Sequence, residues 1–385
     1  MTDTFMTIRV TMMGPSRVGK TTLLTAILEN ARALLEGTSV TMLPADLATE
    51  ERLRKNDIEL TGDLMAGEFR AGSLSMTTDV SIYRMLISPG VEGAGLRMDF
   101  LDFPGGLLTP SVRATRGGDD WQEIQLVLRV STAMLIPIDA VVLMEARSTD
   151  EKRAIPGILG LGDVRKLVED WAKHRNRERD QPGTLILSPV KCESYFTDNG
   201  GRGRDRGVDL FNRVQDVYGS VIDTVRNEAK NVHIDIVYSP IDSIGCVELV
   251  NPRWKPTPYG LAPDPEFLVR PPGRRRVLGA DDVLVPLVRQ VVAAGKRSAE
   301  DISRVAEEER KRAHRLANLD FWDAAGQFGF WNELWARLDG VKAQRKQFEN
   351  ERSAAAEEAL KRLDEYDAAL DKIASRPQGP RARIL

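Results

Sequence analysis

The first part of the chain alternates between apolar runs and segments in which apolar residues recur at helical spacing. Met6–Met13 is an apolar, β-branched run that predicts a strand. Apolar residues three and four positions apart in Thr22–Leu35 predict a helix with one face against a sheet. Thr38–Gly72 is polar and irregular, except for a helix predicted over Asp46–Met65 with Asp46 as its N-cap.

Two extended segments follow this polar region. Thr77–Ser88 alternates apolar and polar residues, and a second extended run covers Leu96–Phe103 after a turn over Pro89–Gly95. Because two strands joined by a short turn pair with each other, these segments predict an antiparallel hairpin.

Strands and helices then alternate along the chain. We predict helices over Trp121–Leu135, Gly157–His174 and Val208–Lys230, and strands over Ile138–Ala146, Gly183–Val190 and Val232–Ser239. This alternation after an initial hairpin is typical of a doubly wound, mostly parallel sheet with one antiparallel edge strand, covered by helices on both faces. The predicted fold class is therefore α/β, with residues 1–250 as the main domain.

The remainder of the chain changes in composition. Residues 251–295 are rich in proline and arginine, which predicts a connector without regular structure that ends in a short helix over Asp281–Ala294. Residues 296–374 are charged, lack proline and carry apolar residues at heptad-like spacing, so they predict a helical hairpin or coiled coil. Residues 375–385 are predicted to be a flexible basic tail.

Composition narrows the class of protein. The formal net charge of −3 over 385 residues argues against a protein that binds nucleic acid with its whole surface. Two cysteines, Cys192 and Cys246, do not make a disulfide framework. The longest apolar run, Ala133–Met144, is too short to span a bilayer. We therefore expect a soluble cytoplasmic protein whose partners include neither a membrane nor nucleic acid.

The clearest chemical signal is GPSRVGKT, from Gly14 to Thr21, which matches the phosphate-binding pattern GxxxxGK[ST] between a predicted strand and a predicted helix. Backbone N–H groups of such a loop surround phosphate oxygens. Lys20 would reach the β- and γ-phosphates, and the Thr21 hydroxyl would hold Mg²⁺. The predicted nucleotide-binding residues here are Gly14, Ser16, Arg17, Val18, Gly19, Lys20, Thr21 and Thr22.

A second motif, DFPGG, covers residues 102–106 directly after the predicted hairpin. A carboxylate at the end of a strand, followed by a glycine turn, suits a Mg²⁺–phosphate site. We predict that Asp102 holds the metal and that the Gly105 N–H approaches the terminal phosphate.

The order of these motifs and elements, over about residues 5–245, resembles the Ras-like (TRAFAC) P-loop GTPases. The opening motif, the DFPGG turn and the helical tail are also similar to the double-GTPase family of bacterial conflict systems. The resemblance implies a GTP-binding switch with Mg²⁺, acting in bacterial defence or conflict. Nucleotide would order residues 70–80 and 102–118, and a protein partner would contact these switch segments or the C-terminal helices.

The resemblance also implies roles for residues outside the two motifs. Thr77 or Thr78 matches the switch threonine that contacts Mg²⁺ and the γ-phosphate, and we take Thr78 as the metal ligand. Lys191 and Glu193 stand where the family reads the purine with [NT]KxD; the lysine stem would cover the ring, and the glutamate would accept from guanine. The last family motif would be Ser239-Pro240-Ile241 or Ser243-Ile244-Gly245.

One departure from the family bears on catalysis. Many members place a water-positioning Gln or His after DxxG, but this chain has Gly106, so unaided hydrolysis should be slow and stimulated by a partner. Arg17, Arg113 and Arg116 are candidates for an arginine finger supplied by the chain itself. The predicted catalytic residues are Lys20, Arg17 and Thr78.

Two alternatives remain open at this stage. An ATPase or nucleotide kinase would use the same loop, although related ATPases usually carry a glutamate beside the metal-binding aspartate and here Phe103 follows Asp102. An assembly adaptor would hold its nucleotide with little turnover. The sequence fixes neither the partner nor the oligomeric state.

Overall fold

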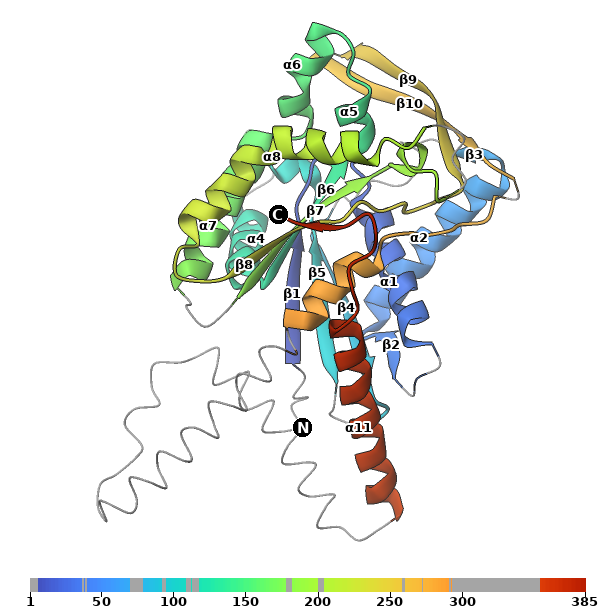
Figure 1. The fold of residues 1–385 in the computed structure, drawn as a ribbon, viewed down its shortest axis with the longest axis vertical. Coiled ribbons are helices and arrows are strands. Elements are labelled where there is room, and N and C mark those ends of the chain that lie inside the picture. Colours follow the sequence, from blue (N-terminus) through green and yellow to red (C-terminus); the bar gives the residue numbers. More distant parts are fainter. Residues whose placement is uncertain are drawn as a thin grey trace.

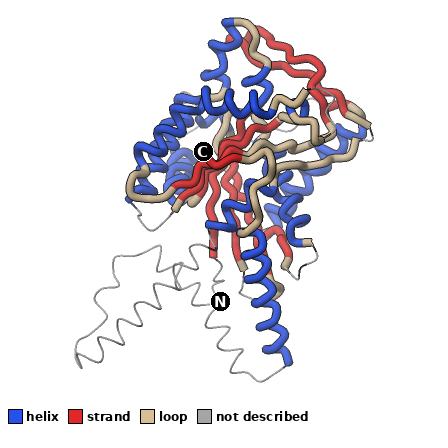
Figure 2. Tube along the Cα trace, viewed as in Figure 1, coloured by secondary structure: helices blue, strands red, loops and turns tan. Residues whose placement is uncertain are grey.

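The computed structural model describes residues 6–36, 38, 40–69, 79–91, 95–108, 112, 118–177, 182–199, 204–257, 260–271, 273–290, 292 and 354–385. Within these ranges the chain builds an α/β body around an eight-stranded sheet with the strand order β11-β8-β7-β6-β1-β5-β4-β2 (Figure 1). Helices lie on both faces of this sheet (Figure 2). The prediction of an α/β chain with a mostly parallel sheet is confirmed.

The strands of the large sheet are β1 (Met6–Met12), β2 (Thr41–Pro44), β4 (Ser81–Ser88), β5 (Leu96–Asp102), β6 (Ala133–Asp139), β7 (Gly183–Val190), β8 (Ile234–Tyr238) and β11 (Arg383–Ile384). Strands β8, β7, β6, β1 and β5 pair in parallel, whereas β4 pairs antiparallel with β5, as the predicted hairpin requires. The prediction that an antiparallel strand forms the sheet edge at β4 is wrong, because β2 pairs outside it. With four residues, β2 is too short to show an alternating pattern.

The helices are α1 (Lys20–Leu35), α2 (Leu47–Met65), α4 (Gly118–Val130), α5 (Ala140–Met144), α6 (Thr149–Ile158), α7 (Leu161–Arg177), α8 (Gly207–Glu228) and α11 (Ala354–Ala374), with a further helix over 281–290 and short 3-10 turns η1 (Gly105–Leu108) and η2 (Glu193–Tyr195). The predicted cap of α2 is confirmed, since Asp46 Oδ1 accepts from the Thr49 N–H at 2.7 Å. Such a cap satisfies one of the N–H groups that a helix leaves open at its start.

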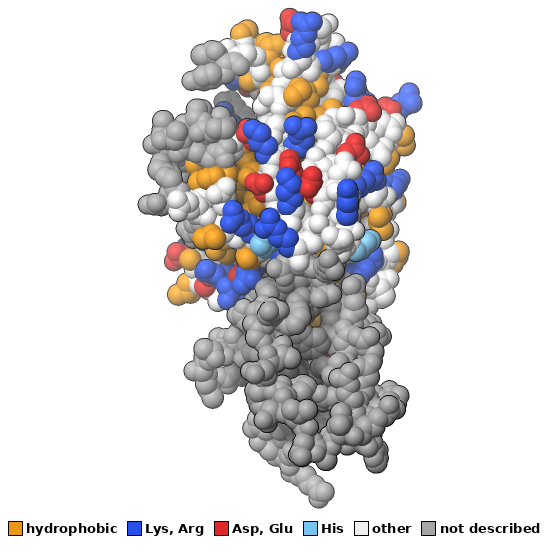
Figure 3. All heavy atoms as spheres, turned by 90° about the vertical axis from the view of Figure 1, so that its left-hand side faces the viewer, with side chains coloured by type: hydrophobic (Ala, Val, Ile, Leu, Met, Phe, Trp, Pro, Cys, Tyr) orange, Lys and Arg blue, Asp and Glu red, His pale blue; other side chains and the backbone are white. Residues whose placement is uncertain are grey.

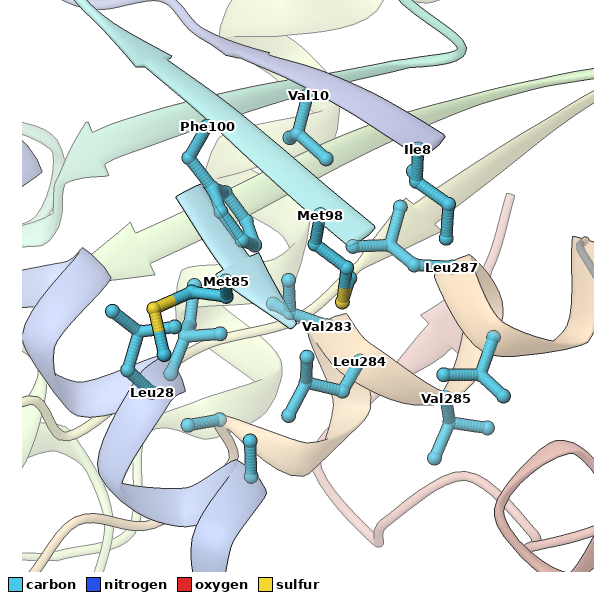
Figure 4. Packing of buried hydrophobic residues seen from close by; sticks show 14 of the residues in the cluster. Ile8, Val10, Leu28, Met85, Met98, Phe100, Val283, Leu284, Val285 and Leu287 are labelled. Carbon is cyan, nitrogen blue, oxygen red and sulfur yellow. The ribbon is translucent and has the colours of Figure 1, made fainter. Parts of the chain in front are cut away.

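Alternating residues of each strand separate the core into two layers. On β6, Ala133 and Leu135 pack on the face covered by α1, the 281–290 helix and α11. Met134 and Ile136 of the same strand pack on the opposite face, under α4, α7 and α8. Figure 4 shows the first layer, where Val283, Leu284 and Leu287 of the 281–290 helix lie against side chains of β1, β4 and β5. The predicted short helix therefore belongs to the core of the main body.

The predicted strand over Ile138–Ala146 is misplaced. The strand in this region is β6, Ala133–Asp139, and the helix before it ends at Val130 rather than at Leu135. Asp139 ends the strand because its Oδ1 accepts from the Val141 and Val142 N–H groups at 3.1 and 3.2 Å and so begins α5. An apolar run buried in both a strand and a helix gives no periodicity that separates them.

The prediction of an irregular connector after residue 250 is also wrong for most of its length. The strands β9 (Val247–Thr257) and β10 (Gly260–Val269) pair antiparallel, and β10 also pairs with β3 (Glu68–Phe69) in a small three-stranded sheet. In Figure 1 this hairpin extends along one end of the body beside α6. Through this pairing, the segment that directly follows α2 lies beside β10.

The hairpin tolerates its prolines because of where they fall in the register. Pro252 pairs with Pro265, Pro263 with Trp254, and Pro256 with Leu261, so all four prolines occupy the same alternate set of positions. Proline has no N–H, and at such positions the missing N–H would point away from the partner strand. The residues between them keep the ladder intact, and side-chain ion pairs reinforce it, including Lys255 with Asp264 at 3.0 Å.

The last predicted segment is placed differently from expectation. Residues 375–385 were expected to form a flexible tail, but β11 pairs antiparallel with β8, and the Leu385 N–H donates to the Ile236 carbonyl at 2.8 Å. Figure 1 shows this tail running from the end of α11 to the sheet. The basic residue Arg381 is only 8 % exposed, which shows that its charge is paired rather than solvated. Of residues 296–374, predicted to be a helical hairpin or coiled coil, the structure describes the helix α11, and residues 296–353 lie outside the described residues.

Two observations describe the surface of these ranges. No helix in these ranges is both long enough and apolar enough to cross a membrane. On the face shown in Figure 3, Lys and Arg side chains are interspersed with Asp and Glu, so this face carries no continuous field of one sign.

Candidate functional site

The predicted site residues gather at the carboxyl ends of the parallel strands. The loop that follows β1, the DFPGG turn after β5 and the segment after β7 meet at this edge because parallel strands all end on the same side of their sheet. Residues Ser243 and Ile244, which follow β8, join them from the neighbouring strand. The strand order β8-β7-β6-β1-β5 thus lays out the site along the sheet edge.

The loop between β1 and α1 has the backbone conformation of a tight bend. Gly19 lies at φ 105° and Arg17 at φ 64°, so both adopt left-handed conformations, and Gly19 is the N-cap of α1. Glycine reaches this region without steric cost, whereas a residue with a side chain does so rarely and mostly at functional sites. A bend with left-handed residues at the start of a helix is the kind of backbone whose N–H groups can converge on an anion.

Lys20 is held across the base of this bend. Its Nζ donates to the Gly14 carbonyl at 3.1 Å and to the Pro15 carbonyl at 3.3 Å, and the residue is only 5 % exposed. Burial lowers the pKa of this ammonium, and the nearby Asp102 carboxylate opposes that shift. A buried cation that contacts only carbonyls and a single carboxylate neighbour is electrostatically ready to receive an anion.

Thr21 and Asp102, far apart in the sequence, lie side by side. The Thr21 Oγ1 hydroxyl donates to Asp102 Oδ2 at 3.3 Å, and Asp102 is fully buried. The register of the parallel pair β1–β5 sets this distance, since Met12 at the end of β1 is directly opposite Asp102. A hydroxyl and a carboxylate at this separation can share one hydrated Mg²⁺ together with phosphate oxygens.

Gly105 packs directly on the bend between β1 and α1. A Cβ added at Gly105 would lie 2.2 Å from the Ser16 nitrogen and 2.3 Å from the Pro15 carbonyl carbon. These are backbone atoms, which cannot rotate away as a side chain can. The absence of a side chain at Gly105 is therefore what lets the DFPGG turn approach the bend.

The other end of the site begins at Lys191, which has the left-handed φ of 57°. Its Nζ donates to the Arg17 carbonyl at 3.1 Å and forms an ion pair with Asp139. The lysine stem thereby spans from β7 to the phosphate-binding bend. Its ammonium is fixed while its methylene groups remain along the wall of the cleft.

Glu193 is buried, with 2 % exposure, at the same end of the cleft. Its Oε1 accepts from the N–H groups of Ile244 and Gly245 at 3.2 and 3.3 Å, and its Oε2 has no hydrogen-bond partner among the described residues. Burial, and next the neighbouring Asp242 carboxylate, raise the pKa of Glu193 to about 7. A buried acceptor without a partner costs free energy unless a ligand donates to it.

One cleft connects these groups. Its lining comprises Ser16, Arg17, Val18, Gly19, Lys20, Thr21, Thr22, Phe69, Gly105, Val190, Lys191, Glu193, Ser243, Ile244, Val247 and Phe267. The cleft holds about 90 Å³, and it shares lining residues with a groove of about 1140 Å³ that is also lined by residues of the β9–β10 hairpin. The predicted loop residues, Gly105, Lys191 and Glu193 thus share one space, with Gly14 and Asp102 directly behind it.

Sequence reasoning missed several residues of this cleft. Phe69 and Phe267 form an edge-on ring pair with centroids 5.8 Å apart, and both line the cleft. Asp139, which anchors Lys191, was hidden inside the misplaced strand. Of the two alternatives for the last family motif, Ser243-Ile244-Gly245 reaches the cleft, whereas Ser239 is buried beside Ser188. Phe69 lies in the two-residue strand β3 and Phe267 in the ten-residue strand β10, and no local pattern indicates that these strands pair.

Several predicted site residues lie outside the described residues: Thr77, Thr78, Arg113 and Arg116. Arg17 lines the cleft with an exposed side chain. The described ranges contain no cluster of three or more His, Cys, Asp or Glu residues suited to a metal. The pair Thr21 and Asp102 is compatible with Mg²⁺, which keeps waters and binds through few protein groups when phosphate oxygens complete its coordination.

Comparisons with known proteins add no assignment to this geometry. The chain matches no model of a known protein family, and it matches no curated protein.

Proposed function

We propose that this chain is a P-loop GTPase of the Ras-like type, which binds GTP with Mg²⁺ and hydrolyses it slowly without a partner. The observation that carries the proposal is the convergence of three groups: the buried Lys20, the Thr21 hydroxyl and the Asp102 carboxylate 3.3 Å from it. An ammonium, a hydroxyl and an acid around a bend of inward N–H groups are what a nucleoside triphosphate and its metal require.

Mg²⁺ would be held by Thr21 and Asp102 together with oxygens of the phosphates. When bound, it would neutralise charge on the phosphate chain. The protein's own groups do the rest of the positioning: backbone N–H groups of the bend bind phosphate oxygens, and Lys20 is oriented toward them by the Gly14 and Pro15 carbonyls. Gly105 brings the N–H of the DFPGG turn to the same place.

The other end of the cleft supports guanine as the base. Guanine presents two neighbouring N–H donors on its pairing edge. Glu193 is one of the residues that line the cleft, and its Oε2 is a buried acceptor without a partner among the described residues. The stem of Lys191, fixed between Asp139 and the Arg17 carbonyl, provides a flat apolar wall for a ring. Unpaired buried groups of this kind discriminate strongly between ligands that can and cannot donate to them.

Slow turnover follows from the residue after DxxG. Gly106 has no side chain that could orient an attacking water, and the nearest side-chain atom to a Cβ placed there belongs to Val112, at 3.7 Å. Phosphoryl transfer depends on positioning and charge neutralisation, so the missing group would have to come from a protein partner. A switch of this kind would hold GTP until that partner arrives.

The experiment that tests the proposal is displacement of a fluorescent GTP analogue from the purified chain by GTP, ATP and inorganic tripolyphosphate, with Mg²⁺ and with a chelator. We expect GTP to displace the analogue at the lowest concentration and the chelator to weaken binding. Equal displacement by ATP would favour the ATPase alternative. Failure of all three to displace it would overturn the proposal.

GTP binding should strengthen as the pH rises through about 7. Because the raised pKa leaves most of Glu193 protonated below this value, and guanine needs an ionised acceptor, affinity at about pH 6 should be roughly tenfold below its plateau. Tripolyphosphate should not show this dependence beyond its own ionisation. Isothermal titration across this range in matched buffers measures both ligands.

The variant Glu193→Gln provides the control for this pH dependence. Its amide nitrogen cannot accept, so GTP affinity should be low at every pH while tripolyphosphate binding is retained. In the unliganded protein the same raised pKa means that Glu193 contributes less to stability as the pH rises from 4.5 toward about 7. A pH-independent GTP affinity in the native chain would contradict the assignment of Glu193 as the base reader.

A further inference from the structure

The base end of the cleft is built on a loop that other parts of the chain hold in place. Ser243 and Ile244 line the cleft, and the Ile244 and Gly245 N–H groups donate to Glu193. Asp242 begins this loop, is fully buried and exchanges backbone hydrogen bonds with Leu278 at 3.0 and 3.2 Å. The position of Asp242 therefore determines where the base-end N–H groups and the Glu193 carboxylate lie.

Within the described residues, Asp242 forms an ion pair with Arg381, which lies in the C-terminal tail after α11. Its Nη2 lies 2.9 Å from Asp242 Oδ2 and also pairs with Asp198, and its guanidinium lies 3.9 Å from the centre of the Phe196 ring. Asn199 Nδ2 donates to the same Asp242 oxygen at 3.1 Å. A planar guanidinium that bridges two carboxylates and stacks on a ring fixes all three groups at once.

We propose that Arg381 is a positioning residue of the nucleotide site, through which docking of the C-terminal tail sets the affinity for the base. The inference rests on the proposed function, since it assigns the control of one end of the same cleft. Arg381 does not line the cleft. It acts through Asp242 on the loop that carries Ser243 and Ile244.

Electrostatics support this link between the tail and Glu193. Asp242 raises the pKa of Glu193 after burial does, so the two buried carboxyl groups repel each other when ionised. The guanidinium of Arg381 neutralises Asp242 from the other side. Without it, an uncompensated carboxylate would remain in the interior, and either the loop would move or a carboxyl group would take up a proton. Movement of the loop, or a proton taken up by Glu193, would remove an acceptor from guanine.

The tail between α11 and Arg381 is tied to the main body by several contacts. The Gly379 N–H donates to Asp282 Oδ1 at 2.6 Å, and Arg376 pairs with Asp281 at 3.1 Å. Arg289 donates to the Ala374 and Arg376 carbonyls at 3.0 and 3.1 Å. These contacts hold residues 374–379 on the 281–290 helix, so the pairing of Arg381 with Asp242 depends on this part of the tail being docked.

The test compares GTP with inorganic tripolyphosphate, which uses only the phosphate end of the cleft. In Arg381→Ala, GTP affinity should fall about tenfold or more while tripolyphosphate affinity stays within about twofold of the native chain. Arg383→Ala is the matched control, because Arg383 lies two residues further along the same tail, has an exposed side chain and donates to the neighbouring Pro380 and Ala382 carbonyls; both affinities should be unchanged. Arg381→Lys should restore part of the loss.

Asp198→Asn gives a milder variant. Asp198 is half-exposed, and its substitution removes one of the two carboxylates that hold the Arg381 guanidinium in place. It should lower GTP affinity in the same direction by a smaller factor, and it decides the question if Arg381→Ala does not fold. Unchanged GTP affinity in Asp198→Asn and Arg381→Ala, or an equal loss for GTP and tripolyphosphate, would overturn the inference. Failure of the native chain to bind either ligand would instead overturn the proposed function.

Discussion

Replacing Lys20 with methionine is expected to weaken GTP and tripolyphosphate binding by about two to three orders of magnitude. Truncating one partner of a buried, charge-assisted contact typically costs about 2–5 kcal/mol, and about 1.4 kcal/mol corresponds to tenfold in affinity. Lys20 is buried and aimed across the phosphate-binding bend by the Gly14 and Pro15 carbonyls, so no neighbouring cation can take its place without rearrangement. Titration of both ligands against native and variant chains measures the loss.

The stability of the same variant separates a binding role from a structural one. Burial lowers the pKa of Lys20, which shows that its charge is held at a cost, and methionine of similar length removes that cost. We therefore expect the unliganded variant to melt at or near the native temperature. Lys173→Met, at an exposed pair with Glu169, should change neither binding nor melting. Near-native affinity in Lys20→Met would show that the ammonium does not contact phosphate.

Gly105→Ala should lower the free energy of unfolding by about 3 kcal/mol and weaken nucleotide binding with it. The added methyl group would overlap the backbone between Pro15 and Ser16, and overpacking against rigid atoms is relieved only when the backbone moves. Either the bend or the DFPGG turn must retreat, which separates the phosphate-binding N–H groups from Asp102. Thermal unfolding should shift down by about 6 °C or more.

The adjacent glycine supplies the control for this prediction. A methyl group at Gly106 would meet Val112 at 3.7 Å, an ordinary contact, so Gly106→Ala should unfold and bind within experimental error of the native chain. Equal behaviour of the two variants would mean that the DFPGG turn does not press on the bend in solution.

Local pattern was sufficient for elements with a continuous apolar run between clear boundaries or with a side-chain cap. The strand Gly183–Val190 and the helix with its Asp46 cap follow from burial and capping chemistry that act within a few residues. The boundary between β6 and α5 could not be found this way, because the apolar residues there continue through both elements. It was the side chain of Asp139, capping the next helix, that fixed the boundary.

The end of the cleft at Lys20 was predictable from the sequence. The end at Glu193, where we propose that the base binds, was only partly predictable. The bend and its lysine are consecutive residues, and Asp102 follows from the order of strands in a parallel sheet. The base end is assembled from β3, the β9–β10 hairpin, the loop after β8 and the C-terminal tail, which are distant in sequence. Contacts such as that of Arg381 with Asp242 leave no trace in local spacing.

The prolines of the β9–β10 hairpin led to a wrong sequence interpretation. It considered how many prolines the segment contains, and did not consider which positions of the strand pair they occupy. Five prolines in residues 252–265 suggested that no strand could form. The four that lie in β9 and β10 occupy one alternate set of positions, so the inward donors at the positions between them are present. Register, rather than content, decides whether proline is compatible with a strand pair.

The same placement has a consequence for how this hairpin can meet other molecules. Where a sheet margin normally offers outward N–H groups, Pro252 and Pro256 leave gaps along one margin, and Pro263 and Pro265 leave gaps along the other. A second copy of the chain, or a foreign extended peptide, therefore finds no continuous backbone template for docking. Any molecule that recognises this arm must do so through its charged side chains, so recognition should weaken as salt is raised.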